Sequence, residues 1–153
     1  MDKNIYLGSD HAGLEMKNAL KAYLQGKDLK LVDLGCFNGE EVDYPDIARE
    51  VSEKVSEEGG GLGILVCGTG IGMMISANKY KGIRAVDCTS ELMAKMAREH
   101  NDANILCLGS HLVDQPTAQK ITDTFINSKF EGAESHLRRL KKMDPGYNPD
   151  DCC

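Results

Sequence analysis

A thiol and a glycine-rich run stand together near the middle of the chain, where a short apolar segment ends. The segment Gly63–Val66 is followed by Cys67 and then by Gly68-Thr69-Gly70-Ile71-Gly72. A tight turn into a helix points backbone N–H groups, and the positive end of the helix dipole, at one place where negative charge is stabilised. A helix N-terminus also favours the thiolate form of a cysteine. The pattern therefore predicts a chemical site in which Cys67 acts as a base or as a nucleophile.

Two histidines and an aspartate come directly after other apolar segments. Asp10 and His11 follow the segment that begins at Asn4, and His111 follows Ile105–Leu108. Because the carboxyl ends of parallel strands meet at one edge of a sheet, we expect these side chains to lie near Cys67.

His100 belongs to a different pattern. It recurs with Leu92 and Met96 at four-residue spacing, near the end of a predicted helix. A core histidine, or one that caps the helix C-terminus, fits this spacing as well as a catalytic histidine does, so a catalytic role is open at this point.

The elements that must position these groups alternate along the chain. Five short apolar segments are predicted strands: 4–7, 29–34, 63–66, 83–86 and 105–108. Helical spacing follows each of these segments, and a last helix is predicted over 135–143. In the helix that follows the glycine run, Ile71, Met74 and Ile75 are predicted to share one apolar face. Such alternation predicts an α/β fold in which helices cover both faces of a parallel sheet. Residues 1–143 are predicted to form one domain, and 144–153 a tail that is loose or lies on a neighbour.

Composition excludes several classes of function. The chain has 153 residues and a formal net charge of −6 with no long basic run, which disfavours nucleic-acid binding. No segment has the length and hydrophobicity of a membrane span, and no signal peptide precedes the first apolar segment. Six cysteines without CxxC spacing disfavour a zinc pair, and together with the missing signal they favour a reducing, cytoplasmic compartment. Most of these thiols are expected to be small core residues.

Other interpretations of the glycine run fit less well. A dinucleotide site needs GxGxxG after the first strand, whereas this run is GxGxG after the third, although Asp87 is near the distance of the ribose-binding carboxylate. A cysteine-phosphatase loop needs an arginine where Met73 stands. A purely structural turn remains the alternative to an anion-binding one.

With these residues in view, the chain resembles the type B ribose-5-phosphate isomerases and their relatives, which act on galactose or allose phosphates. The resemblance covers most of residues 1–131 and rests on six segments in family order: Gly8-Ser9-Asp10-His11-Ala12-Gly13, Val42-Asp43-Tyr44-Pro45-Asp46, Cys67-Gly68-Thr69-Gly70-Ile71-Gly72, Ala77-Asn78-Lys79, Gly82-Ile83-Arg84-Ala85 and Arg98-Glu99-His100-Asn101-Asp102-Ala103-Asn104. It implies a Rossmann-like, three-layer α/β/α sandwich with a five-stranded parallel sheet. It also implies a homodimer or a dimer of dimers, with active sites at the subunit interface and no metal or organic cofactor.

The resemblance implies an aldose–ketose isomerase of carbohydrate metabolism that interconverts ribose 5-phosphate and ribulose 5-phosphate through an enediolate. Cys67 would move the carbon-bound proton, Thr69 would hydrogen-bond the reacting oxygens, and His100 would protonate the ring oxygen to open the sugar. Substrate-binding roles are also implied: the enediolate oxygens for Gly68, Gly70, Ile71 and Gly72, hydroxyl groups for Asp10 and Asn101, and the phosphate for His11, His111 and Arg138. A second branch of the family has a glutamate base where this chain has Met73, so the chain resembles the cysteine branch.

The chain departs from the family pattern where the phosphate should bind. His111 and Glu134 stand at usual arginine positions, while Arg138 is kept. A carboxylate beside a phosphate repels it by about 1 kcal/mol or more. Three alternatives stay open: the same chemistry on a 6-phosphohexose, a non-catalytic sugar-phosphate binding module, and a subunit that needs a paralogous partner.

Overall fold

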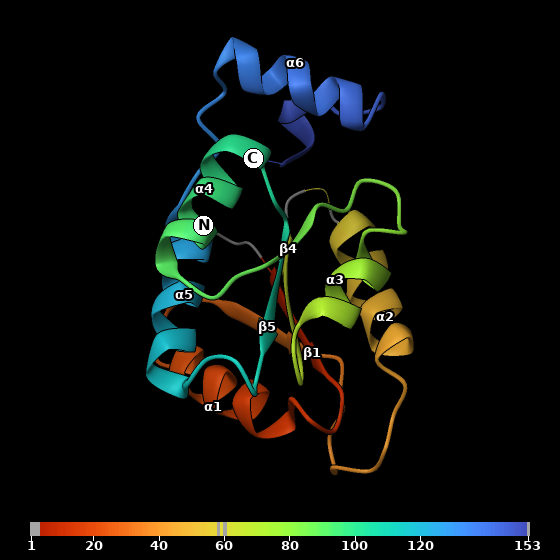
Figure 1. Cartoon of the computed structure of the whole chain (residues 1–153), viewed down its shortest axis with the longest axis vertical. Coiled ribbons are helices and arrows are strands. Elements are labelled where there is room, and N and C mark those ends of the chain that lie inside the picture. The colour runs from red at the N-terminus through yellow and green to blue at the C-terminus, as the bar shows by residue number, and fades with distance from the viewer. Residues whose placement is uncertain (1–3, 58, 60, 153) are drawn as a thin grey trace.

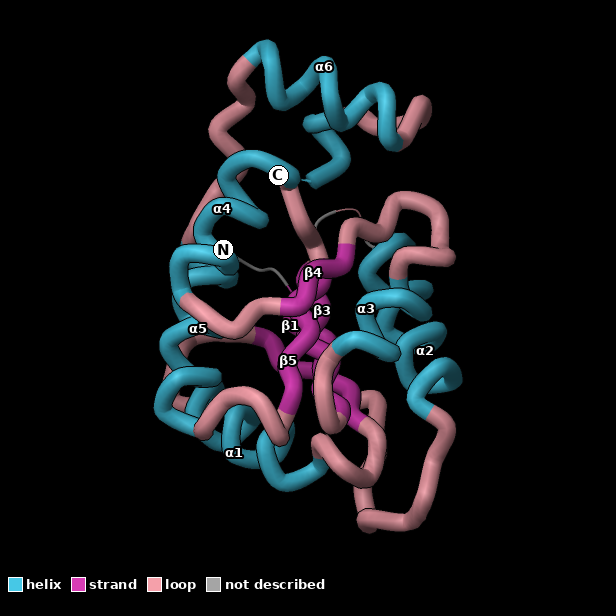
Figure 2. Tube along the Cα trace, in the orientation of Figure 1, coloured by secondary structure: helices cyan, strands magenta, loops and turns pink. Residues whose placement is uncertain are grey.

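The computed structural model describes residues 4–57, 59 and 61–152. They form the predicted parallel sheet of five strands, in the order β2-β1-β3-β5-β4 (Figure 1; Figure 2). The strands are β1 (Asn4–Ser9), β2 (Lys30–Asp33), β3 (Leu62–Cys67), β4 (Ala85–Asp87) and β5 (Ile105–Gly109). All six residues of β3 are buried, as expected for a central strand of a parallel sheet.

Helices cover both faces of the sheet and make three layers. One hydrophobic cluster joins the sheet to α1 (Leu14–Gln25), α4 (Glu91–Asn101) and α5 (Gln115–Asn127). A second cluster joins the opposite face to α2 (Tyr44–Glu57) and α3 (Ile71–Ala77). The α6 helix (Glu134–Met143) lies outside these layers at one end of the molecule, near the end of α4, and a 3-10 turn covers Pro149–Cys152 (Figure 1). The predicted three-layer α/β/α fold is confirmed.

Local capping explains where two of these helices begin. The Ser90 side chain accepts a hydrogen bond from the Met93 N–H at 3.3 Å and starts α4. The Asp114 carboxylate accepts one from the Thr117 N–H at 2.9 Å and starts α5. Each cap satisfies a backbone donor that has no partner within its helix.

The predicted apolar face of α3 is wrong in part. The helix buries Met73 and Ala77 completely, whereas Ile71 and Ile75 are 49% and 53% exposed. Helical spacing finds an apolar stripe but does not say what covers it. The α3 helix has two apolar stripes, and the stripe that contains Met73 is the one that packs on the sheet.

The α4 helix shows the same effect. Its sheet-facing residues are Ala94 and Ala97, whose small side chains let the helix approach the sheet closely. The predicted stripe instead leaves Leu92 65% and Met96 45% exposed. The α3 and α4 helices lie on opposite faces of the sheet, on either side of the edge strand β4 (Figure 1).

Part of the tail is held by its own chain. The Tyr147 side chain is buried, and its hydroxyl group donates a hydrogen bond to Asp102 Oδ2 at 3.0 Å. The guanidinium of Arg84 lies 4.9 Å from the centre of the Tyr147 ring. The expectation of a loose tail is therefore wrong at Tyr147, while the side chains of Cys152 and Cys153 lie outside the described residues. Within the described ranges, no helix has the length and apolar character that crossing a bilayer requires.

Candidate active site

Cys67 is the last residue of β3 and lies inside the glycine turn. Its Sγ accepts a hydrogen bond from the Gly70 N–H at 3.1 Å, and the residue is 5% exposed. Gly70 precedes α3 with φ +79°, a left-handed conformation that glycine adopts without strain. The turn therefore places a polarised N–H donor against the sulfur, which stabilises negative charge on it.

Two other buried cysteines lie where the thiol form is favoured. Burial raises the pKa of the Cys88 thiol to about 12, and it raises the pKa of Cys107 well above the usual value. These two thiols stay protonated and serve as small core residues. Cys36, Cys67, Cys88 and Cys107 are all buried free thiols, which confirms the expected core placement for the described cysteines.

Asp87, at the end of β4, packs against the same turn. A Cβ on Gly70 would lie 2.3 Å from Asp87 Oδ1, so the carboxylate occupies the space beside this glycine. Oδ1 is buried and has no hydrogen-bond partner within the described part of the chain, and burial raises the pKa of Asp87. Sequence reasoning considered Asp87 only for a dinucleotide site. Asp87 directly follows an apolar segment, as Asp10 does, and this position could have identified it as a candidate site residue.

The loop after β1 brings Asp10 and His11 to this edge. The backbone N–H of Asp10 donates to the Val66 carbonyl at 3.2 Å, and its carboxylate accepts from the Gly13 N–H at 3.0 Å. His11 is exposed, and its Nδ1 accepts from the Val42 N–H at 3.4 Å. Both side chains thus lie at the end of the strand that neighbours β3, as predicted.

Two rings close over glycines of the turn. The His111 N–H donates to the Gly68 carbonyl at 2.9 Å, and a Cβ on Gly68 would lie 2.9 Å from His111 Cδ2. A Cβ on Gly72 would lie 2.7 Å from the Tyr44 ring. Tyr44 was not predicted as a site residue, although it belongs to one of the segments that carried the family resemblance.

The structure thus assembles one group of predicted site residues at the edge where the strands end, which we call the carboxyl-end cluster. The strand register explains the assembly, because Val66 pairs with both Ser9 and Leu108 and the three strands end at the same level. Thr69 is exposed within the turn, and its Oγ1 accepts from the Ile71 N–H at 3.4 Å. The cluster comprises Asp10, His11, Cys67, Gly68, Thr69, Gly70, Ile71, Gly72 and His111.

The remaining predicted residues lie at the opposite edge. A helix that joins two parallel strands must run back along the sheet, so α4 ends where β5 begins (Figure 1). His100 and Asn101 are therefore near the start of β5, whereas Cys67 pairs with Gly109 at its end. Five residues of β5 separate the two edges, a span of about 13 Å. One chain does not bring His100 and Asn101 to Cys67.

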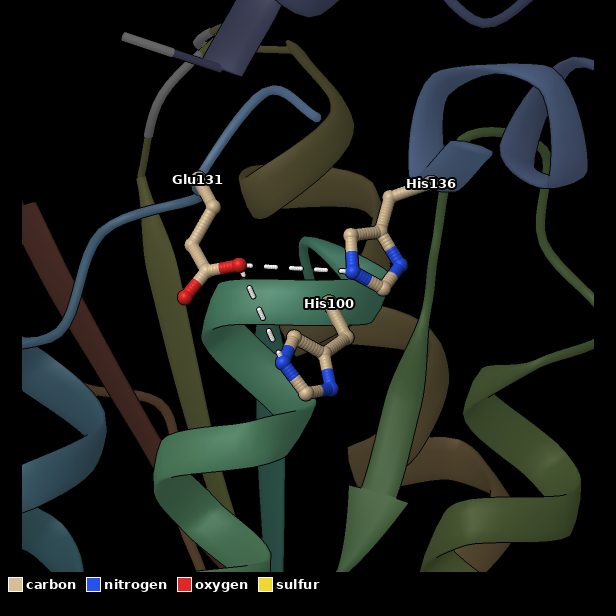
Figure 3. Close-up of side chains that lie close together, drawn as sticks. All are labelled: His100, Glu131 and His136. Carbon is tan, nitrogen blue, oxygen red and sulfur yellow. Dashed lines mark ion pairs between the residues drawn. The ribbon is translucent and has the colours of Figure 1, made fainter. Parts of the chain in front are cut away.

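His100 lies close to Glu131 and His136, and we call these three residues the amino-end cluster (Figure 3). Its Nε2 lies 3.8 Å from Glu131 Oε2, and His136 Nε2 lies 4.0 Å from the same oxygen. The two imidazole rings stack with centroids 4.5 Å apart and an interplanar angle of 8°. Among residues 4–57, 59 and 61–152, this is the one group of three whose types and spacing suit a metal ion. Arg138 and Glu134 are exposed on the neighbouring α6.

Comparison with known proteins assigns this fold and these loops to a family. The model of the ribose/galactose isomerase family matches residues 5–143. The chain belongs to this family. The chain is therefore an aldose–ketose isomerase by family, which confirms the expected enzyme class.

Relatives of the isomerase match it over nearly their full length. Ribose-5-phosphate isomerase B of Escherichia coli is 38% identical over 141 residues, which cover 92% of this chain and 94% of the relative. The structure of the Clostridium thermocellum ribose-5-phosphate isomerase B has a TM-score of 0.90 at 42% identity, covering 93% and 95% of the two chains. The Mycoplasma genitalium isomerase B, solved with bound ribulose 5-phosphate, has a TM-score of 0.89 at 43% identity, covering 94% and 95%.

Proposed function

We propose that this isomerase interconverts ribose 5-phosphate and ribulose 5-phosphate, with Cys67 as the base that moves the proton between C2 and C1. The observation that carries the proposal is the Gly70 N–H···Sγ hydrogen bond inside the glycine turn. It holds the sulfur beside backbone donors, and the reaction needs both a base and a donor set for the enediolate. The similar Mycoplasma genitalium protein with bound ribulose 5-phosphate supports the choice of substrate.

The proton transfer itself stays within the carboxyl-end cluster. The Cys67 thiolate takes the proton from C2 of the open-chain aldose, and the electron pair moves onto the oxygens of an enediolate. Backbone N–H groups of the Gly68–Gly72 turn and the Thr69 hydroxyl group donate to these oxygens. A proton then moves from O2 to O1 of the enediolate, and return of the proton from Cys67 to C1 gives the ketose, with its carbonyl group at C2. Asp10 holds a sugar hydroxyl group, while His11 and His111 face the phosphate.

We further propose that a second copy of the chain completes each site. Ring opening needs an acid, and His100 lies in the last turn of α4, whereas Cys67 pairs with Gly109 at the far end of the following strand, β5. A homodimer, alone or within a dimer of dimers, would bring His100, Asn101 and Arg138 of one copy to the carboxyl-end cluster of the other. The exposed apolar stripes beside β4, Ile71 and Ile75 on α3 and Leu92 and Met96 on α4, support this pairing because water-exposed apolar area favours association.

The substrate assignment is tested by assaying the purified chain with ribose 5-phosphate, allose 6-phosphate and galactose 6-phosphate. We expect the highest kcat/KM with ribose 5-phosphate. A higher value with either hexose phosphate would move the assignment to that substrate. Binding of all three without turnover would indicate a non-catalytic binding module or a missing paralogous partner.

The shared site is tested by combining two inactive variants. Cys67→Ala and His100→Asn are co-expressed with different affinity tags, and mixed dimers are isolated through both tags. If the two groups come from different subunits, each mixed dimer has one complete site and about half of the wild-type activity. If both groups come from one chain, no complete site exists and the mixed dimers are inactive. The same tags on two wild-type chains provide the control.

A further inference from the structure

We propose that the amino-end cluster binds a divalent transition-metal ion of the zinc class, and that bound metal inhibits the isomerase by capturing His100. The sequence resemblance implies no metal for the reaction, so the proposed ion acts as a regulator rather than as a cofactor. The metal site itself stands on the residues described below. Its inhibitory effect rests on the proposed function of His100.

The donor set selects the class of metal. Two imidazole nitrogens and one carboxylate oxygen suit Zn²⁺ and its transition-metal neighbours, whereas Mg²⁺ and Ca²⁺ prefer oxygen ligands alone. His100, Glu131 and His136 come from three separate segments: the last turn of α4, the connection after α5 and the first turn of α6. No shared helical spacing brings them together, so their meeting is a result of the tertiary fold.

The distances are close to those of a coordinated ion. One ligand atom from each residue lies within 4.8 Å of the other two, and both Nε2 atoms lie at 4.0 Å or less from Glu131 Oε2. Donor atoms around a tetrahedral Zn²⁺ are about 3.3 Å apart. To close the site, each ligand atom would have to move inward by about half an ångström. The imidazole rings, which are stacked in the structure (Figure 3), would also have to turn until their nitrogens point at one ion.

Exposure and charge also suit a reversible site. The side chains of His100, His136 and Glu131 are 33%, 18% and 48% exposed, so an ion can enter and a water molecule can take the fourth position. The Glu131 carboxylate offsets one charge of the ion. Neutral imidazoles provide the other two ligands.

Capture of His100 has a defined chemical consequence. A metal-bound imidazole nitrogen carries no proton to donate, so the ring oxygen of the sugar loses its acid. Ribulose 5-phosphate has no ring to open. Zinc is therefore expected to slow turnover of ribose 5-phosphate more than turnover of ribulose 5-phosphate.

Zinc binding is measured directly by titration calorimetry on chain treated with a chelator. The experiment uses a Cys152→Ser/Cys153→Ser background, because adjacent thiols also bind zinc. We expect one Zn²⁺ per chain, with affinity lowered at least tenfold by His136→Asn or Glu131→Gln. His11→Asn and Glu134→Gln, which change the same residue types outside the cluster, serve as matched controls and should keep the affinity. Absorption of Co²⁺ in place of Zn²⁺ reports whether the bound ion is tetrahedral.

The outcomes separate the site from the proposed function. No zinc binding, or binding that His136→Asn leaves unchanged, overturns the metal site whether or not the chain is an isomerase. Binding with the expected losses in a chain that turns over no sugar phosphate supports the site and overturns the proposed function. Binding with equal effects on ribose 5-phosphate and ribulose 5-phosphate overturns inhibition through His100.

Discussion

The Gly70 N–H donates a hydrogen bond to the Sγ of Cys67 over 3.1 Å, and it does so from a left-handed backbone conformation. The carboxylate of Asp87 packs against the same glycine from β4. A thiol and a carboxylate therefore meet at a residue without a side chain. This arrangement depends on glycine in two ways, through its conformation and through the space that a Cβ would take.

Gly70→Ala is expected to reduce both activity and stability. The positive φ alone costs an L residue about 1–2 kcal/mol, and the added Cβ must also displace Asp87. We expect kcat to fall at least tenfold, because the donor to Cys67 moves with the backbone. Gly132→Ala is the matched control, since Gly132 also has positive φ but has open space around its Cβ position. It should lose stability in urea titrations but keep its kcat, and equal losses of kcat would contradict the role of the turn.

Cys67→Ala is expected to separate turnover from binding. Loss of a proton-transferring group should lower kcat by at least about 100-fold. The affinity for ribose 5-phosphate, measured by calorimetry, should change little. Cys107→Ala, which shortens a buried thiol on the neighbouring strand, should keep kcat near that of the wild type. Wild-type turnover in Cys67→Ala would exclude Cys67 as the base.

His100→Asn is expected to affect the two directions of the reaction unequally. The variant lacks the acid for ring opening, so turnover of ribose 5-phosphate should fall at least tenfold further than that of ribulose 5-phosphate. Initial rates in both directions give the comparison. A parallel loss in both directions would mean that His100 takes part in proton transfer itself or only in dimer structure.

Asp87→Asn is expected to stabilise the protein at neutral pH. Burial raises the pKa of Asp87 above its usual value of 3.8, so the ionised form opposes folding. This penalty is fully present above the folded-state pKa and disappears as the pH falls below the unfolded-state value. The gain in the free energy of unfolding, measured in urea, should therefore shrink between neutral pH and pH about 3.5.

Asp114→Asn provides a control of opposite sign for Asp87→Asn. Hydrogen bonds from Thr117 lower the pKa of Asp114, so its ionised form favours folding. This contribution is present above the unfolded-state pKa and is lost as the pH falls through the folded-state pKa. The variant should be less stable than the wild type at neutral pH. If the free energy of unfolding changed in the same way with pH in both variants, burial would not be the cause of the raised pKa of Asp87.

Lys17→Met is expected to destabilise the fold strongly. Lys17 is fully buried, and its Nζ lies 2.6 Å from Asp33 Oδ1 and donates to the Cys36 carbonyl at 2.7 Å. Removing one partner of a buried ion pair costs about 3 kcal/mol or more. Lys21 pairs with the other oxygen of Asp33 at 3.0 Å but is 35% exposed, so Lys21→Met should cost about 1 kcal/mol or less. Urea unfolding of both variants gives the comparison, and equal costs would contradict the effect of burial.

Much of the fold, and the placement of the carboxyl-end cluster, could be predicted because they depend on local patterns. Apolar runs followed by helical spacing indicated the parallel sheet, and the position of Cys67 after a strand indicated the glycine turn. Asp10, His11 and His111 could be placed beside it, because strands that run in parallel end at one edge. The chain order of short segments also carried enough information to predict the family.

Only the tertiary structure decided what covers each helix and which distant residues meet. Spacing identified apolar stripes on α3 and α4, but in each helix another set of residues packs on the sheet. Met73 is buried on α3 while Ile75 is exposed, and Ala94 is buried on α4 while Met96 is exposed. Crossover geometry placed His100 at the edge opposite Cys67, where it meets Glu131 and His136 from segments more than 30 positions further along the chain. Sequence spacing says little about such pairs, because packing of the whole chain sets their distances.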